Sequence, residues 1–533
     1  MPKITILEKD LTTAGASELL SNIVYVPGYA ITGPENTPTL CRTLDEFKET
    51  FGSVPYKFKS NQYINTGSNI YAYADDYEKS YTYALELVNR GLPILFERYV
   101  KNINYVASAT LTPTSDAENG LVIKAIYSGI EGASYGYEVT EAADNQYSFI
   151  FTKNGITINP TKPVTISLDD TKSNYFKRVS TDYIIFTSIG TLTKETKLDI
   201  TTNTGKLEMP SDMTNEEFTV SDFYTKMKGS SDSNIVVESI FDKLANNKDL
   251  YNIKIITSGS YPTFTKVKGF KTEIADKMIQ SAANLNDVTA IIDHSDDCDV
   301  NYLLSNISSL TDTTDASGDD AKKYAAMFTP WGTYTTNVAA NYLTSNLINM
   351  PASFAYISAL ANSIKSNPNW YAVAGVTRGV VPGLKSLQTI ITGAQSEKLQ
   401  ETTGISINPI MNVPSYGYCI WGNRTLHKND GLVASSFLNI RTLVNDIKKV
   451  VYQTSKELTF ELNNDVTWLK FKSKIEPTLD KMATGNGING YKIIRAKTDK
   501  KATIKAIIRI YPIEAVEDFD ITIELADSFT TAK

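Results

Sequence analysis

The sequence has little of what secreted, membrane-spanning and acid–base catalytic proteins need. Its 533 residues include only three cysteines, Cys41, Cys298 and Cys419, which are too few and too far apart for a disulfide framework or a cysteine-rich zinc site. We therefore expect free thiols in a reducing cytoplasm. No run approaches the 18 apolar residues of a membrane-spanning helix, and the opening MPKITILEKD places charges where a secretory signal has its apolar stretch. We expect no membrane partner and synthesis in the cytosol.

Positive charge is also scarce. Fifty-two Lys and Arg stand against 59 Asp and Glu, which gives a net charge of −7. A protein that covers a phosphate backbone over a broad face needs the opposite sign, so we expect no direct nucleic-acid partner. Hydrophobic residues at 42% and charged residues at 21% are typical of globular chains, and the length predicts three or four domains. The 31 tyrosines suit both ordinary cores and protein interfaces.

The order of strand-like and helix-like segments predicts an α/β (α+β) core with an inserted mainly-β domain. Residues 23–26 and 94–100 resemble strands, and a helix over 44–51 is expected to start at Thr43 or Asp45 and to stop at Gly52. Short alternating runs with turn dipeptides such as Asn154-Gly155 then indicate an all-β module. The predicted parts are an N-terminal arm (1–20), the first part of the core (21–106), the β-rich insert (107–240), the rest of the core (241–515) and a C-terminal arm (516–533).

Nucleotide-binding motifs are absent or out of context. Residues 485–490 match G-x-G-x-x-G, but a helix is expected before them and a strand after them, the reverse of a dinucleotide-binding unit. We interpret this segment as a turn. No G-x-x-x-x-G-K-[ST] sequence occurs. We therefore predict no cofactor.

Metal and catalytic chemistry have one candidate segment each. Asp293, His294 and residues 296–299 crowd metal-type ligands together, but the spacing fits no closed zinc or calcium loop, and a solvated loop is the preferred interpretation. His427 has Asp430 nearby but no marked nucleophile. We predict no metal site, no catalytic residue and no enzymatic activity.

The C-terminal half contains a series of short motifs. They are N-P-N-W at 367–370, A-G at 374–375, R-G-V at 378–380, W-G-N-R-T-L at 421–426, F-L-N-I-R-T-L at 437–443, F-E-L-N-N-D with Trp468 at 460–468, and I-Y-P-I-E-A-V-E at 510–517. In this order they resemble the contractile tail sheath proteins of phages, bacteriocins and injection systems. Upstream, G-P-E-N-T-P at 33–38, the strand ending in Asp293 and Pro330-Trp331 are similar to the family's earlier elements. The P-G-V-Y-like opening of many members is missing.

The resemblance implies a structural subunit that polymerises helically around a tail tube and contracts to drive the tube through a target cell envelope. The expected partners are further copies of the chain, the tube protein, and baseplate and tail terminator proteins. The expected location is the virion tail, after assembly in the host cytoplasm. The alternatives are the sheath of a phage-like protein-injection particle or bacteriocin and, less favoured, a non-contractile structural virion protein.

Seven motif residues are candidate structural anchors: Trp370, Trp421, Arg424, Arg441, Glu461, Asn463 and Trp468. We expect Trp421 and Trp468 to be buried, because large aromatic side chains hold domains together. Arg424 and Arg441 could form buried ion pairs with Glu461 and Asp465.

Two further sets are candidate contacts in the assembly. Lys470, Lys472, Lys474 and Lys481 could face an acidic tube, although a solvated helix face is the simpler interpretation. The resemblance implies strand arms that pair with sheets of neighbouring subunits, carried by Ile4 and Ile6 at one end and by Phe519, Ile521 and Ile523 at the other. The β-rich insert is expected to lie away from the polymer contacts.

Overall fold

The computed structural model describes most of the chain between residues 22 and 515. The described ranges are 22–57, 77–100, 103–114, 118–143, 145–158, 162–210, 220–232, 235–266, 271–338, 342–343, 345–401, 404–427, 433–498 and 502–515. Both predicted arms, and with them Ile4, Ile6, Phe519, Ile521 and Ile523, lie outside the described residues. Among the described helices, none is both long enough and apolar enough to span a bilayer.

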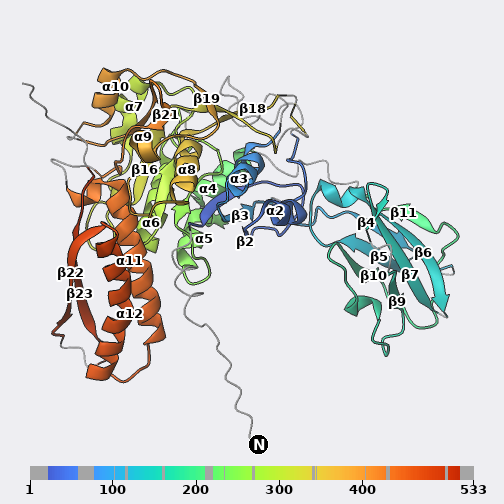
Figure 1. The fold of residues 1–533 in the computed structure, drawn as a ribbon. Coiled ribbons are helices and arrows are strands. Elements are labelled where there is room, and N and C mark those ends of the chain that lie inside the picture. The colour runs from blue at the N-terminus through green and yellow to red at the C-terminus, as the bar shows by residue number, and fades with distance from the viewer. Residues whose placement is uncertain are drawn as a thin grey trace, which may run out of the picture.

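The centre of the molecule is an eight-stranded sheet (Figure 1). Its six inner strands run parallel and its two edge strands antiparallel. The strands in spatial order are β2 (Pro38–Cys41), β3 (Ile94–Arg98), β1 (Val24–Gly28), β14 (Ile255–Ile256), β15 (Thr289–Ile292), β16 (Ala325–Thr329), β20 (Asn408–Val413) and β21 (Gly417–Ile420). The inner strands are buried along most of their length, as expected of a parallel sheet that is covered on both faces.

Helices cover the two faces of the sheet and form two separate hydrophobic clusters. One cluster contains α2 (Leu44–Phe51), α3 (Lys79–Asn89) and α8 (Ala352–Ser363). The other contains α4 (Val220–Lys228), α5 (Ile240–Asn246), α6 (Glu273–Leu285), α7 (Val300–Asn306) and α10 (Gly393–Leu399). Helix α2 begins and ends where the sequence predicts, because the Thr43 side chain accepts a hydrogen bond from the backbone N–H of Glu46 and Gly52 has a φ of 89°.

The segment from residue 106 to residue 209 forms a β-rich unit with its own hydrophobic core. Its strands are β4 (Ser108–Leu111), β5 (Gly120–Ala125), β6 (Tyr135–Ala143), β7 (Gln146–Lys153), β8 (Ile156–Thr157), β9 (Val164–Ser167), β10 (Ile184–Ile189) and β11 (Thr204–Lys206). Figure 1 shows this unit projecting to one side of the central sheet. Helix α4 lies within the insert that we predicted to end at residue 240, but its Phe223 and Tyr224 pack in the main core instead.

A buried arginine joins the β-rich unit to the sheet. Arg98, at the carboxyl end of β3, is fully buried. Its guanidinium donates hydrogen bonds to the carbonyl oxygens of Ala30, Gly33 and Ser128 at 2.6, 2.8 and 2.8 Å. Ser128 also donates its backbone N–H to the Glu35 carboxylate at 2.6 Å. The loop after β1 and the loop at Ser128 therefore meet on one side chain, which fixes where the β-rich unit leaves the core.

The strand end at Asp293 is buried, so the solvated loop expected from the sequence is wrong for Asp293 and His294, whereas Asp297 and Asp299 are exposed as expected. Asp293 is 1% exposed and accepts hydrogen bonds from the backbone N–H and the hydroxyl of Ser353 at 3.0 and 2.6 Å. Its carboxylate thus caps the first turn of α8, which packs across the sheet. His294 is 2% exposed, with its ring nitrogens 2.8 Å from the Ser295 carbonyl oxygen and 3.0 Å from the Thr329 hydroxyl.

Replacement of Asp293 by Asn should change how stability depends on pH. Burial raises the pKa of Asp293 to about 7, against an ordinary value near ~3.9 for an unfolded aspartate. The folded state therefore favours the protonated carboxyl, and this contribution to stability is lost as the pH rises from ~4 to ~7. An Asn side chain can still accept from Ser353 and carries no charge. We expect Asp293→Asn to become progressively more stable than the natural chain over this pH range in urea unfolding. If the difference in unfolding free energy between the variant and the natural chain does not change with pH, the burial of the charged group is contradicted.

Candidate assembly surface in the C-terminal unit

The last described part of the chain forms a compact unit of two long helices and one β-hairpin. Helices α11 (Leu438–Glu457) and α12 (Asp465–Thr484) are antiparallel neighbours, and β22 (Ile488–Ala496) and β23 (Lys505–Pro512) pack against α12. A hydrophobic cluster separate from the two clusters of the central sheet holds them together. Figure 1 shows this unit on the opposite side of the molecule from the β-rich unit.

Trp370 anchors the turn between α12 and β22. It is 8% exposed, and its indole N–H donates to the carbonyl oxygen of Gly485 at 2.9 Å. A Cβ added at Gly485 or Gly487 would come within 2.8 Å of the indole ring. The two glycines thus let the backbone lie flat against Trp370. The G-x-G-x-x-G segment is a helix-to-strand turn, as predicted.

The hairpin has two open edges. Within the described residues, β22 and β23 pair only with each other. One face, with Tyr491, Ile493 and Ile508, packs on the helices, whereas the opposite face carries the cross-strand pair Lys492 and Arg509. Each strand therefore offers one row of backbone N–H and C=O groups to a further strand. Main-chain recognition of an extended segment needs this geometry.

The four candidate tube-facing lysines lie on α12, and three of them make ion pairs within the unit. Lys470 pairs with Glu461 at 3.6 Å, Lys472 with Glu476 at 3.2 Å, and Lys474 with Glu457 at 2.5 Å. Lys481 lies in the last turn of α12, near the negative end of the helix dipole. The lysines are about half exposed, so each pair adds little to stability.

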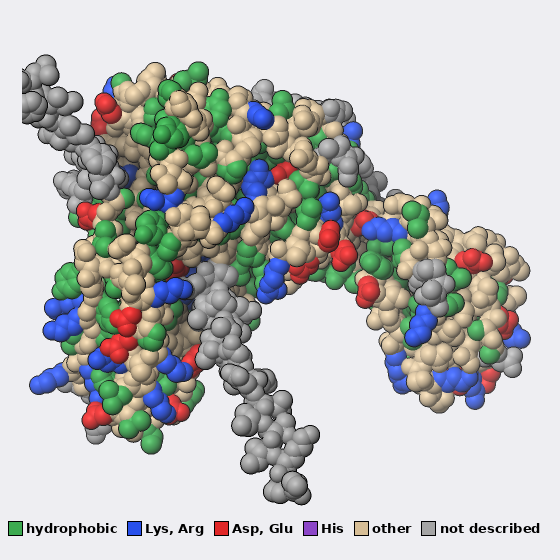
Figure 2. All heavy atoms as spheres, viewed as in Figure 1, with side chains coloured by type: hydrophobic (Ala, Val, Ile, Leu, Met, Phe, Trp, Pro, Cys, Tyr) green, Lys and Arg blue, Asp and Glu red, His purple; other side chains and the backbone are tan. Residues whose placement is uncertain are grey.

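The turn between α11 and α12, together with the start of α12, exposes an apolar tip. We use this name for Phe460, Leu462, Val466 and Leu469, whose side chains are exposed. Phe460 is fully exposed and has a φ of 73°, in the left-handed region. Figure 2 shows hydrophobic side chains among the charged ones at this end of the unit.

A polar joint connects α11 to the central sheet. Lys254, which precedes β14, pairs with Asp446 at 2.7 Å, and both side chains are buried. Lys449 donates to the Ile253 carbonyl oxygen at 2.6 Å, and burial lowers the pKa of this lysine. Farther along α11, Lys456 pairs with Asp249 at 3.0 Å on the surface. The sheet and the C-terminal unit therefore meet largely through charged groups.

The motif residues do not pair as expected. Arg441 is buried with its guanidinium 4.7 Å from the Tyr324 ring centroid, and Arg424 stacks on Phe437 at 4.7 Å. Glu461 instead pairs with Lys470, while Asp465 binds Arg495 at 2.6 Å. The predicted buried Arg–carboxylate pairs are wrong.

The remaining motif side chains also separate into buried and exposed ones. Trp421 is 41% exposed and so is not the core anchor that we expected, whereas Trp468 is half-buried against the unit's core. Asn463 lies at the end of the α11–α12 turn, where its side-chain oxygen accepts from Arg495 at 3.4 Å.

The crevice where doubly wound folds bind ligands is filled by the chain itself. The order of the strands reverses between β1 and β14, and ligands of such folds bind at the carboxyl ends of strands at this point. Here Glu78 caps α3 and accepts from Ser80 N–H, Tyr81 N–H and the Tyr261 hydroxyl at 2.8, 3.0 and 2.6 Å. Burial raises the pKa of the Glu78 carboxyl. A Cβ at Gly28 would lie 1.9 Å from Ser80 Oγ, so little space remains.

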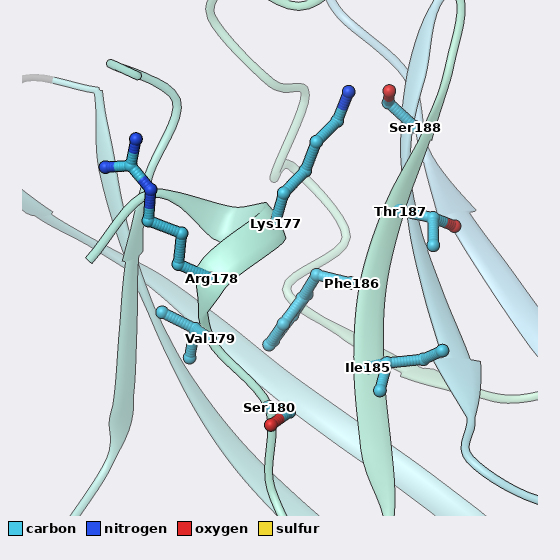
Figure 3. A pocket seen from close by; sticks show the side chains of 8 residues that line it. All are labelled: Lys177, Arg178, Val179, Ser180, Ile185, Phe186, Thr187 and Ser188. Carbon is cyan, nitrogen blue, oxygen red and sulfur yellow. The ribbon is translucent and has the colours of Figure 1, made fainter. Parts of the chain in front are cut away.

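The other candidate sites for ligand binding, catalysis or metal binding are no stronger than this crevice. A hollow of about 480 Å³ in the β-rich unit is lined by Lys177, Arg178, Phe186 and five further residues, with no carboxylate, His or Cys among them (Figure 3). His427 lies 3.0 Å from Asp320 in a partly buried pair. In the part of the chain that the structure describes, no three His, Cys, Asp or Glu side chains gather into a metal-binding group.

Comparisons with known proteins relate the chain to tail sheath proteins. No family model matches. The tail sheath protein of Vibrio phage KVP40 is 28% identical over 137 residues, which are 25% of this chain and 19% of that protein. The tail sheath protein of Enterobacteria phage T4 is 26% identical over 157 residues, or 29% of this chain and 22% of that protein. The matched stretches thus span about a fifth of those relatives.

The fold is similar to that of a solved sheath structure over almost the whole chain. The crystal structure of the sheath tail protein of Listeria innocua has a TM-score of 0.60 and 10% sequence identity, and the match covers 94% of this chain and 95% of that one. The chain is thus similar in sequence to two phage tail sheath proteins over a quarter to a third of its length, and similar in fold to a further sheath tail protein.

Trp370 is buried and Trp421 is exposed, so replacing each in turn tests whether Trp370 anchors the C-terminal unit. Trp370→Ala should destabilise the unit by about 3–5 kcal/mol, because it leaves a cavity over Gly485 and Gly487. Trp421→Ala should cost less than about 1 kcal/mol, since its ring is 41% exposed. Thermal and urea unfolding measure both effects. Equal losses for the two variants would contradict the anchoring role of Trp370.

Proposed function

We propose that the chain is the subunit of a contractile tail sheath, which polymerises helically around an inner tube and contracts to drive the tube through a target cell envelope. The alternatives are the sheath of a phage-like protein-injection particle or bacteriocin and, less favoured, a non-contractile structural virion protein. The observation that carries the proposal is the open-edged hairpin of the C-terminal unit, on a fold similar to a sheath tail protein. The function is mechanical and uses no cofactor.

Strand exchange between copies would build the polymer. Residues 1–20 and 516–533 both contain strand-like runs, around Ile4 and Ile6 and around Phe519, Ile521 and Ile523. An arm of ten residues reaches about 33 Å when extended, which is far enough to cross to an adjacent copy. Such arms would add strands to the edges of β22 and β23 of neighbouring subunits.

The charges of the hairpin and of residues 516–533 favour this pairing. The exposed face of the hairpin carries Lys492, Lys505 and Arg509, which make no ion pair with another described residue. Residues 516–533 carry five acidic side chains and one lysine. Opposite charges on adjacent strands favour pairing and select its partner.

Contraction would follow from two alternative packings of the same contacts. Heterologous contacts that do not close into a ring generate an open helix. If the extended packing is the less stable one, a trigger at one end spreads through the array, and the tube, baseplate and terminator proteins hold the extended state until then. The β-rich unit has its own core and a narrow connection at Arg98, so we place it at the periphery, away from these contacts.

Electron microscopy of the purified protein tests the proposal. The full chain should form striated hollow tubes. A chain that ends at Val516 should remain a folded monomer with near-native thermal stability and should form no tubes, because it lacks the acidic strand. A chain that ends at Asp527 keeps that strand and should polymerise. Tubes from the shorter chain, or its outright unfolding, would show that the C-terminal segment is not an intersubunit arm.

A second test concerns the lysines of α12, which we propose face the tube. Lys470→Glu with Lys474→Glu should weaken co-sedimentation with the tube protein and reduce its dependence on salt, because complementary charges are removed. Lys365→Glu, an exposed lysine on the central part of the molecule, is the matched control. If tube binding and its salt dependence stay as in the natural chain, the lysines form only a solvated face.

A further inference from the structure

An apolar groove lies beside the point where the described chain begins. It has a volume of about 560 Å³, and it is formed by the edge strand β2, the start of β3 and the segment 250–253. The lining residues are Ile23, Pro38, Leu40, Arg42, Pro93, Leu95, Leu250, Tyr251, Asn252 and Ile253. Pockets of this size hold drug-sized ligands, so two leucine side chains fit.

The groove is incompletely covered by the residues around it. Leu250 on its rim is 70% exposed, while Leu95 and Ile253 at its base are buried. Leu40 and Tyr251 are only half-buried, although they pack on the main hydrophobic cluster. A partner that covered these side chains would therefore remove apolar surface from water, which stabilises the docked state.

The described chain begins next to this groove. Ile23 lines one end of it, and its position is fixed because its carbonyl oxygen accepts from Lys254 N–H at 2.9 Å and from Ile255 N–H at 3.3 Å. The next residue, Val24, donates its N–H to the Pro93 carbonyl oxygen at 3.1 Å. Twenty-one residues precede the described chain, and at about 3.3 Å per residue the three before Asn22 span about 10 Å.

The residues that immediately precede Asn22 complement the groove in both polarity and charge. They read Ala16-Ser17-Glu18-Leu19-Leu20-Ser21, with two leucines next to one acidic side chain. Arg42 is the one charged residue among those that line the groove, and it makes no ion pair with another described residue.

We propose that Leu19 and Leu20 of the chain's own N-terminal segment dock in this groove, with Glu18 paired to Arg42. Docking ties the base of the segment to the edge of the central sheet and leaves residues 1–15 to extend from a fixed point and in a fixed direction. The inference concerns a contact within one chain, so it stands or falls independently of tube formation.

Hydrogen exchange of the full chain, at a concentration where size-exclusion chromatography shows a monomer, tests this docking. Leu19→Ser with Leu20→Ser should speed amide exchange about tenfold or more in peptides that cover residues 38–42 and 250–253, because two buried leucines are lost. Leu7→Ser with Leu11→Ser is the matched control in the same segment and should leave exchange unchanged. Peptides from β22 and β23 should not respond in either variant.

A charge exchange separates docking from a general loss of stability. Glu18→Arg and Arg42→Glu should each speed exchange in the groove, and the two together should restore protection, since the pair is re-formed with opposite signs. Unchanged exchange in the Leu19 and Leu20 variant, or no restoration in the charge-exchanged chain, would overturn the proposal. Protection that appears only at concentrations where the chain self-associates would assign the groove to a second copy instead, and would equally overturn it.

Discussion

A parallel sheet exposes apolar side chains on both faces, and the need to cover both faces determines the rest of this molecule. Helices α2, α3 and α8 cover one face, and α4, α5, α6, α7 and α10 cover the other. Once both faces are occupied, further parts of the chain can attach only at the ends and edges of the sheet. The β-rich unit attaches at the carboxyl end of β3, and the C-terminal unit attaches through α11.

Both attachments are polar, in contrast to the hydrophobic clusters of the units that they connect. Arg98 holds the β-rich unit through carbonyl oxygens, and the Lys254–Asp446 pair holds α11 to the strand ends. Buried polar contacts stabilise less than apolar packing of the same volume, but they accept only one geometry, because a shifted charge loses its partner. The joints therefore define the angles between the units more than they contribute to the free energy of folding.

The sequence indicated the local structure well and the long-range contacts poorly. The helix expected over 44–51, starting at Thr43 or Asp45 and stopping at Gly52, is α2 with Thr43 as its cap, because caps act within a few residues of the helix. Helix α4 falls within the predicted β-rich insert, since its polar surroundings resemble the insert and only its packing against the sheet shows otherwise. The burial of Asp293 depends on α8, about 60 residues away, and Trp421 is exposed where the chain leaves the edge strand β21. The site residues in the arms and on α12 remain predictions.

The open edges of the hairpin determine how a strand bound to them would resist a pulling force. At about 3.3 Å per residue, β22 and β23 present edges about 26–30 Å long. A strand bound along such an edge and pulled along its axis is loaded in shear, so all its main-chain hydrogen bonds share the force, whereas a pull across the edge would peel them one at a time. A slip by one residue would also turn every side chain to the opposite face, which the alternating pattern of β23 penalises. The edge is therefore strong against sliding and weak against peeling, so the direction of a load decides whether the contact holds.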